Sequence, residues 1–309
     1  MGRHAVSLAR VVDRVLHRSP AQMVSRRRNA SHLAVLAYHG VSDPNAFARQ
    51  LDHLVANYRP VSLTDVAAAV EAHSRLPAHA VLVTFDDGDR SVFDTALPLL
   101  RVRNIPAVLF VVTALLGTDT PFWWDEVEWL VAHGAESGEI RAGDPAGAVR
   151  ALKRMPEADR LRAIEELRAS SPAPAPPRPQ LQPEELLTFV DAGVEIGSHS
   201  VTHPILTECG TEQLGDELRA SRDRLAAILG VPPIAFAYPN GDRDDRVRSA
   251  VHDAGYSLAF LFDHALTLMP PADPLRISRV RVDAHAPLDR FATIVSGLHP
   301  AVHRLRGGA

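Results

Sequence analysis

The sequence predicts an α/β fold, a parallel barrel that carries one helical insertion, and three observations support this expectation. From Leu33 onward, short apolar runs alternate with segments of helical period, as a parallel α/β fold requires. This rhythm breaks between Gly117 and Gln182. Without that stretch, residues 33–300 have about the length of one compact barrel.

The composition limits the kinds of protein that this chain can be. Hydrophobic residues make up 46 % of the 309 residues, enough for a large core and too many for a disordered chain. The net charge of −4 gives no reason to expect a nucleic acid partner. The single cysteine, Cys209, leaves no internal disulfide and fits a reducing compartment. We find neither a membrane-spanning run nor the apolar region of a secretory signal, so we expect a cytoplasmic protein without signal peptide or transmembrane helix.

Residues 1–32 form a basic amphipathic segment with seven arginines and one acid, Asp13. Its apolar residues follow the spacing of one helical stripe: Leu8, Val11, Val12, Val15 and Leu16. Two interpretations stay open. Residues 5–18 can make peripheral contact with the anionic inner surface of a membrane. Alternatively, the segment is a helix that caps the barrel, or a frayed leader.

Eight apolar runs are expected to form strands: Leu33–Tyr38, Pro60–Leu63, Val81–Phe85, Ala107–Val112, Val194–Ser198, Ile234–Tyr238, Tyr256–Leu261 and Leu275–Val282. Helices are expected between most of them, including Thr64–Ala72, Ser91–Arg103 and Glu212–Leu229. The last of these is the best marked, since Thr211 can cap it and Gly230 can end it.

We interpret residues 117–182 as a helical insertion into the barrel. The stretch contains Trp123 and Trp124, continues with helical periodicity through Arg168, and ends in a linker with five prolines between Ser171 and Pro179. The tryptophans are either core anchors or a platform for substrate, with Trp124 as the candidate for substrate contact. Residues 301–309 are expected to form a tail.

Two adjacent carboxylates, Asp86 and Asp87, end the predicted strand Val81–Phe85. Successive side chains on a strand point to opposite faces, so the two acids cannot do the same work if the strand continues through them. Parallel α/β enzymes place their chemistry at such strand ends. One acid could bind a metal while the other accepts a proton. The alternative is a simple Asp-Asp-Gly turn.

A pair of histidines, His199 and His203, follows the predicted strand Val194–Ser198. Among 15 histidines, a pair four residues apart also arises by chance, and His299 with His303 repeats the spacing. The context separates the pairs, because His299 follows a helical stretch and not a strand.

Together with Asp87, the two histidines would supply two imidazoles and one carboxylate, a set that leaves an open position on Zn²⁺ for water. Asp86 could then accept the proton of that water. The turn Pro239-Asn240-Gly241 follows another predicted strand and could aim a backbone N–H at an oxyanion. His39 ends the first strand, where a proton donor could lie.

In their order along the chain, these motifs resemble the polysaccharide deacetylases, carbohydrate esterase family four with its NodB homology domain. The resemblance covers roughly residues 33–285 and is carried by Thr84–Gly88, His199–Pro204, Phe236–Gly241, Tyr38–Gly40 and Leu275–Arg279. It implies a distorted seven-stranded (β/α)7 barrel similar to a TIM barrel and a metal-dependent hydrolase that removes acetyl groups from sugars.

The resemblance also implies roles for individual residues. Asp86 would be the base, and the ligands of Zn²⁺ or another divalent metal would be Asp87, His199 and His203. The N–H of Asn240 would be an oxyanion donor. We expect Tyr238 and Pro239 of the same motif, with Trp124, to bind substrate.

The chain departs from the family pattern at two places. Ala237 stands where many members have an arginine, which leaves open what tunes Asp86. No convincing late Leu-x-His is present to supply the general acid, and some relatives use the early histidine, here His39.

The hypothesis is therefore a zinc-dependent deacetylase of an N-acetylated sugar in a polysaccharide, lipid-linked or nucleotide-linked form. Alternatives are hydrolysis of a small non-sugar amide on the same barrel and a non-catalytic sugar-binding relative. Two histidines and a carboxylate also describe iron(II) oxygenases, but these need no adjacent base such as Asp86.

Overall fold

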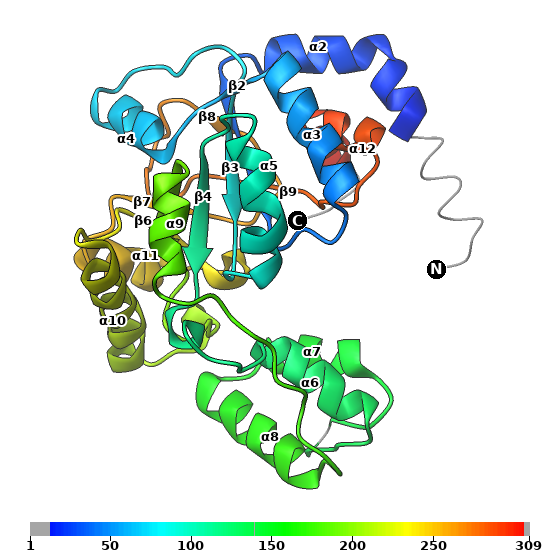
Figure 1. The fold of residues 1–309 in the computed structure, drawn as a ribbon, viewed down its shortest axis with the longest axis vertical. Helices are drawn as coiled ribbons and strands as arrows, with labels where there is room; N and C mark the ends of the chain where they lie inside the picture. Colours follow the sequence, from blue (N-terminus) through cyan, green and yellow to red (C-terminus); the bar gives the residue numbers. More distant parts are fainter. Residues whose placement is uncertain (1–12, 139, 306–309) are drawn as a thin grey trace.

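The computed structural model describes residues 13–138 and 140–305, and parallel strands form its centre (Figure 1). Six of them lie in the order β7-β6-β5-β4-β3-β1, and β9 pairs with β1. Their bounds are β1 His32–Tyr38, β3 Ala80–Phe85, β4 Ala107–Val111, β5 Val194–Ser198, β6 Ala235–Ala237, β7 Leu258–Phe260 and β9 Val280–Arg281. β1, β3 and β4 are buried on both faces, apart from half-buried His32 at the start of β1, because helices cover the outside of the sheet.

The segment 277–281 joins the two edges of the sheet. Val280 pairs in parallel with Leu36 of β1, and Ile277 forms a parallel bridge with Phe260 of β7. The parallel strands thereby close into a distorted ring, which confirms the predicted barrel and matches the seven strands that the family implies.

The expectation of one continuous strand over Leu275–Val282 is wrong. Between Ile277 and Val280, the backbone N–H groups of Ser278 and Arg279 donate to side chains, the Thr267 hydroxyl and the Asp263 carboxylate. These side-chain acceptors replace the strand ladder locally. Two short strands also differ from expectation: β2 (Arg59–Pro60) pairs with β3, and β8 (Thr267–Leu268) pairs antiparallel with β1.

Capping decides where several helices begin and end. The predicted strand Pro60–Leu63 is cut short because Ser62 and Asp65 form a capping box that starts α4 (Leu63–Glu71). Gly210, not Thr211, precedes α10 (Thr211–Leu229), which ends at left-handed Gly230 as expected. The other helices of the barrel are α3 Pro44–Asn57, α5 Leu97–Arg101, α9 Glu185–Asp191, α11 Asp245–Asp253, α12 Leu288–Val295 and α13 Leu298–Leu305.

The predicted helix Ser91–Arg103 is divided. A wide π-turn over Val92–Ala96 precedes α5. Pro98 explains the change, because it has no N–H for the carbonyl group four residues earlier.

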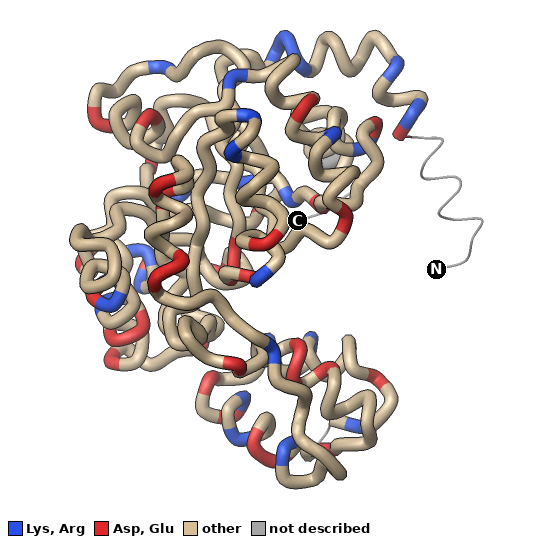
Figure 2. Tube along the Cα trace, in the orientation of Figure 1, with Lys and Arg blue, Asp and Glu red and all other residues tan. Residues whose placement is uncertain are grey.

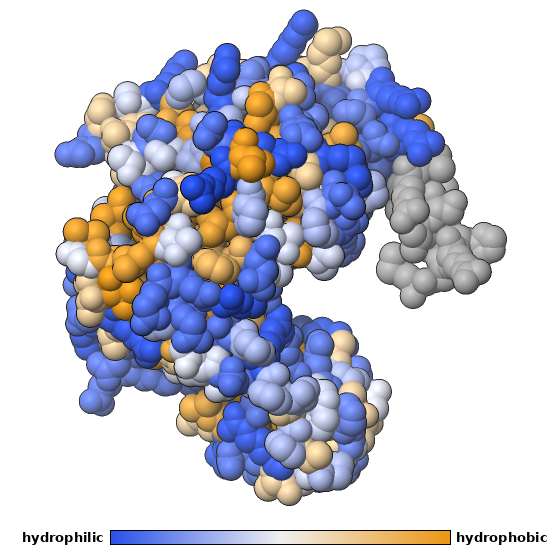
Figure 3. Space-filling view, in the orientation of Figure 1, coloured by the Kyte–Doolittle hydropathy of each residue, from blue (hydrophilic) through white to orange (hydrophobic). Residues whose placement is uncertain are grey.

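Three helices between β4 and β5 form a separate layer beside the barrel: α6 Trp123–Ala132, α7 Pro145–Leu152 and α8 Glu157–Ser170 (Figure 1). They have a core of their own that includes Val127, Leu130, Leu152 and Ile164. The proline-rich stretch then returns toward the barrel, and Arg178 pairs with Asp89 of the barrel and with Asp125 of α6. A hollow separates this layer from the barrel on one face of the molecule (Figure 3).

The basic segment enters the described part at Asp13, and α2 (Pro20–Arg28) carries arginines over the barrel (Figure 2). Gln22 and Ser25 donate hydrogen bonds to carbonyl groups of Ala292 and Ser296 at the end of α12. Of the predicted apolar stripe, Leu8, Val11 and Val12 lie outside the described residues. No described helix is long and apolar enough to span a bilayer.

Candidate active site

The two sequence motifs meet at the carboxyl ends of β3 and β5. The Oδ1 atom of Asp87 lies 3.5 Å from Nε2 of His199 and 3.6 Å from Nε2 of His203. Ligand atoms of the three side chains all lie within 4.8 Å of one another, and all three residues are buried. In the described part of the chain, this is the group of acids and histidines that could hold a metal ion.

The state of each side chain fits a divalent metal. Oδ1 of Asp87 is buried without a hydrogen-bond partner among the described residues. Nδ1 of His199 lies 2.8 Å from the Ala237 carbonyl oxygen, so Nδ1 carries the proton and Nε2 keeps its lone pair toward Asp87. Burial lowers the pKa of His203 well below its ordinary value and raises the pKa of Asp87. A bound cation would offset the cost of burying this carboxylate.

The loop that carries the histidines is held in an unusual backbone conformation. Ser200 and His203 have φ values of 66° and 58°, which non-glycine residues rarely adopt. Glu217 of α10 stabilises the loop, because its carboxylate accepts from the backbone N–H groups of Val201 and Thr202 at 2.7 and 3.0 Å. The carboxylate also accepts from the Thr202 hydroxyl at 2.6 Å.

Asp86 lies beside this set but has a different partner. The guanidinium of Arg279 binds both of its carboxylate oxygens, at 2.6 and 2.8 Å, and both side chains are buried. Burial is the largest single influence and would raise the pKa of Asp86, but the charge and hydrogen bonds of Arg279, together with the nearby imidazoles of His199 and His39, outweigh it and hold the pKa below its ordinary value. Asp86 is therefore an ionised carboxylate inside the protein.

Arg279 was not among the site residues predicted from the sequence. Because Ala237 stands where many family members have an arginine, the sequence did not show which residue pairs with Asp86. Arg279, in the segment that closes the barrel, is that partner. The signal was present, since Arg279 ends the stretch Leu275–Arg279 that carried part of the resemblance.

The remaining candidates line one pocket of about 260 Å³ with Asp86, Asp87 and the two histidines; they are His39, Trp124, Tyr238 and Asn240. The exposed ring of His39 lies edge-on to Phe262 at 5.3 Å. The ring of Trp124 packs on His203 at 4.7 Å. Asn240 has a left-handed φ of 56°.

Tyr238 and Pro239 were expected to contact substrate, but the Tyr238 hydroxyl has a partner within the protein and Pro239 does not line the pocket. The hydroxyl of Tyr238 donates to the Leu275 carbonyl at 3.0 Å, and the side chain is fully buried. Pro239 is buried and is not among the residues that line the pocket.

The insertion supplies three pocket residues that no sequence motif marked: Glu128, Val149 and Lys153. Lys153 directly follows α7, and its Nζ donates to Oδ1 of Asn240 at 2.8 Å. Burial lowers the pKa of Lys153.

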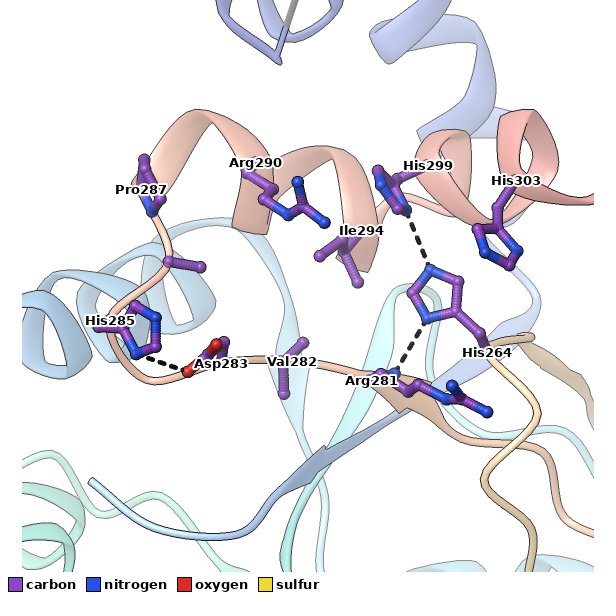
Figure 4. A pocket seen from close by; sticks show the side chains of 11 residues that line it. His264, Arg281, Val282, Asp283, His285, Pro287, Arg290, Ile294, His299 and His303 are labelled. Carbon is purple, nitrogen blue, oxygen red and sulfur yellow. Dashed lines mark hydrogen bonds and ion pairs between the residues drawn. The ribbon is translucent and has the colours of Figure 1, made fainter. Parts of the chain in front are cut away.

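The second histidine pair lies in another place. His299 and His303 are on α13, and Nδ1 of His299 lies 3.0 Å from Nε2 of His264 (Figure 4). Neither histidine belongs to the group that could hold a metal.

With this fold and this site, the chain belongs to the polysaccharide deacetylase family. The model of that family matches residues 73–139 and 160–259, more than half of the chain. The matched stretches include Asp86, Asp87, His199, His203 and Asn240.

Curated relatives match over short regions. A chitin deacetylase of Cryptococcus neoformans var. grubii is 38% identical over 74 residues, 24% of this chain and 16% of the relative. The peptidoglycan-N-acetylmuramic acid deacetylase PdaC of Bacillus subtilis is 32% identical over 72 residues, 23% of this chain and 15% of the relative. This chain thus matches a small part of the length of either protein.

Solved structures share the fold over most of the chain. The deacetylase PplD of Streptococcus pyogenes aligns with a TM-score of 0.61 at 18% identity, covering 85% of this chain and 98% of that one. IcaB of Ammonifex degensii aligns with a TM-score of 0.60 at 22% identity, covering 86% and 97%. At these identities the likeness supports the barrel and says nothing of substrate.

Proposed function

We propose that this chain is a metal-dependent hydrolase that removes the acetyl group from an N-acetylated sugar. Family membership supports the reaction class. The observation that carries the proposal is the ionised Asp86, held by Arg279 next to Asp87, His199 and His203. Zn²⁺ fits a set of two imidazoles and one carboxylate best, with another divalent ion as the alternative.

Each side chain has a separate task in the proposed hydrolysis. When bound, zinc would act as a Lewis acid and lower the pKa of a water molecule. Asp86 would accept the proton of the attacking water, because Arg279 keeps it ionised. The backbone N–H of Asn240 would hydrogen-bond the oxyanion formed from the acetyl carbonyl. His39 would protonate the departing nitrogen, giving acetate and an amino sugar.

The test is release of acetate from three substrate classes: an acetylated polysaccharide, a lipid-linked sugar and a nucleotide sugar, after chelation and after zinc is restored. Asp86→Asn should keep the metal and lower kcat by about 10²–10⁴ if the general base is lost. Asp94→Asn is the control, since this acid lies exposed beyond the same strand. Loss of metal together with activity in Asp86→Asn would make Asp86 a ligand and contradict the assigned roles.

The same measurements separate the alternatives. Acetate from a small amide but from none of the sugars would favour a non-sugar amidase, and sugar binding without acetate would favour a non-catalytic relative. An iron(II) oxygenase would contain bound iron and would consume oxygen. We place the reaction in the cytoplasm, supported by the single buried thiol of Cys209.

A further inference from the structure

Lysine is almost absent from this chain. Of its 33 basic side chains, 32 are arginines and one, Lys153, is a lysine. Apart from Lys153, every lysine or arginine side chain of the protein is therefore a planar guanidinium. The only lysine side chain lies at the pocket that holds Asp86, Asp87, His199 and His203.

The contact of Lys153 joins the insertion to the barrel at the proposed oxyanion turn. Its Nζ donates to Oδ1 of Asn240 at 2.8 Å. Asn240 has a φ of 56°, in the left-handed region that asparagine tolerates better than most residues. A hydrogen bond to its side chain therefore helps to fix the direction of its backbone N–H.

Arginine cannot easily replace lysine at this position. A guanidinium is a wide, rigid fork, whereas an ammonium is a compact charge on a flexible stem. Lys153 is half-buried in a pocket of about 260 Å³, between α7 and the turn after β6. A compact donor reaches the Asn240 amide oxygen without filling the pocket.

We propose that Lys153 is a positioning residue through which the insertion sets the geometry of Asn240. This inference rests on the proposed function, but the contact itself can be tested without turnover. The insertion then completes the active site of the barrel, although it lies outside the strand-end motifs.

A double-mutant cycle tests whether Lys153 acts through Asn240. Asn240→Gly keeps the left-handed backbone and the N–H but removes the acceptor of Lys153. Lys153→Met and Asn240→Gly should each lower kcat by about tenfold or more with little change in KM, because the transition state loses alignment. The double variant should be no slower than the slower single variant. Multiplied losses, or a change confined to KM, would overturn the positioning role.

A second readout does not depend on activity. Reductive ¹³C-methylation labels only Lys153 and the α-amino group, which gives an NMR signal for this one side chain. The Lys153 signal should shift in Asn240→Gly without substrate and stay unchanged in the control Asn57→Gly, at the end of α3 and outside the pocket lining. An identical signal in wild type and Asn240→Gly would show that the contact is absent. If no sugar is deacetylated, this shift still decides the contact.

An independent observation concerns a second pocket, of about 480 Å³, between β9, α12 and α13 (Figure 4). Its polar lining has two arginines and four histidines against one acid: Arg281, Arg290, His264, His285, His299, His303 and Asp283. Nη1 of Arg290 lies 3.8 Å from Oδ2 of Asp13, and the guanidinium of Arg281 donates to the Phe262 carbonyl. Nδ1 of His285 lies 2.8 Å from the Asp283 carboxylate, so basic side chains outnumber acids in the lining although two of them have acidic partners.

The tautomers in this pocket are set by hydrogen bonds. The backbone N–H of Arg281 donates to Nδ1 of His264 at 3.1 Å, so Nε2 of His264 carries the proton and donates to Nδ1 of His299 at 3.0 Å. His264 is therefore neutral.

This pocket shares two lining residues with a neighbouring pocket that reaches Asp87. Asp283 and His285 also line a neighbouring pocket of about 570 Å³, whose other residues include His39, Asp87 and Trp124. A substrate could thus extend from the proposed reaction centre to the arginines.

We infer that the pocket of Arg281 and Arg290 binds a phosphoryl group of the substrate, which favours a phosphate-linked sugar over a neutral polymer. This inference also rests on the proposed function. Calorimetry with inorganic pyrophosphate on Asp86→Asn tests binding without turnover. Arg290→Gln should weaken binding at least about tenfold if a charge-assisted bond is lost, whereas Arg248→Gln on α11 should not. No binding, or equal binding by both variants, would overturn the site.

Activity then identifies the source of the phosphate. Arg290→Gln should lower kcat/KM for an acetylated nucleotide sugar or for a lipid-linked sugar in vesicles, and leave a neutral acetylated oligosaccharide unchanged. A loss with the nucleotide sugar alone assigns the soluble substrate, and a loss with the lipid-linked sugar alone assigns the lipid. Equal losses on all three would overturn the phosphoryl role.

Discussion

At the residue scale, the proposed metal set makes the sharpest prediction. Asp87, His199 and His203 would supply most of the protein ligands, so His203→Ala should lose most bound zinc after dialysis. His299→Ala is the matched control, because His299 belongs to a pair with the same spacing on α13. Zinc per chain is the measurement. Full occupancy in His203→Ala would contradict the ligand assignment.

His39 is the proposed acid, and its test depends on the leaving group. An amine must be protonated as it departs, whereas an activated ester needs little protonation. His39→Ala should therefore lose far more rate on an acetylated sugar amide than on an activated acetate ester, with zinc still bound. Equal rate losses on the two substrates would remove His39 from the acid role.

The sequence predicted that five residues lie together, because the carboxyl ends of parallel strands meet on one side of a barrel: Asp86, Asp87, His199, His203 and Asn240. It could not assign Arg279 to Asp86. The two residues are 193 positions apart, and no spacing rule distinguishes one buried arginine among 32. The sequence also could not predict that Lys153 lies at the pocket, because its position depends on how the insertion packs.

At the element scale, α10 positions the metal loop through Glu217. This buried carboxylate accepts three hydrogen bonds from Val201 and Thr202, between the two histidines. Glu217→Ala should weaken zinc affinity by about 10–100-fold, as loss of an outer-shell partner does. Titration with a competing chelator measures the affinity. Glu212→Ala, in the first turn of the same helix, is the control, and equal affinity in both variants would contradict this role.

Element boundaries followed the sequence where local chemistry was decisive. Gly230 ended α10 and β5 had the expected bounds, since a glycine at positive φ and a buried apolar run are local signals. The strand over residues 275–282 was broken by contacts with Thr267 and Asp263. Such contacts depend on tertiary structure and cannot be predicted from the hydrophobic periodicity of the sequence.

At the scale of the whole molecule, buried histidines predict sensitivity to acid. Burial and the neighbouring His299 lower the pKa of His264 to about 4. The unfolded chain takes up this proton near pH 6.5, so the stabilisation is present above that pH and is lost as the pH falls toward 4. The free energy of unfolding, measured with denaturant, should fall less between pH 6.5 and 4.5 for His264→Gln than for wild type. The exposed His252→Gln is the control, and parallel curves for wild type and His264→Gln would contradict the prediction.

The basic N-terminal segment gives the last prediction, a peripheral contact with anionic membranes. Deleting residues 1–12 removes Arg3, Arg10 and most of the apolar stripe, but keeps the bonds of Gln22 and Ser25 to the barrel. Two arginines at about 1 kcal/mol each correspond to roughly thirtyfold weaker binding to anionic lipid. Sedimentation with anionic vesicles at low salt should therefore fall, while the unfolding midpoint and acetate release from a soluble substrate stay unchanged. Neutral vesicles are the control for charge. If the full chain and the shortened chain sediment equally, residues 1–12 do not contribute to membrane binding and the prediction is contradicted.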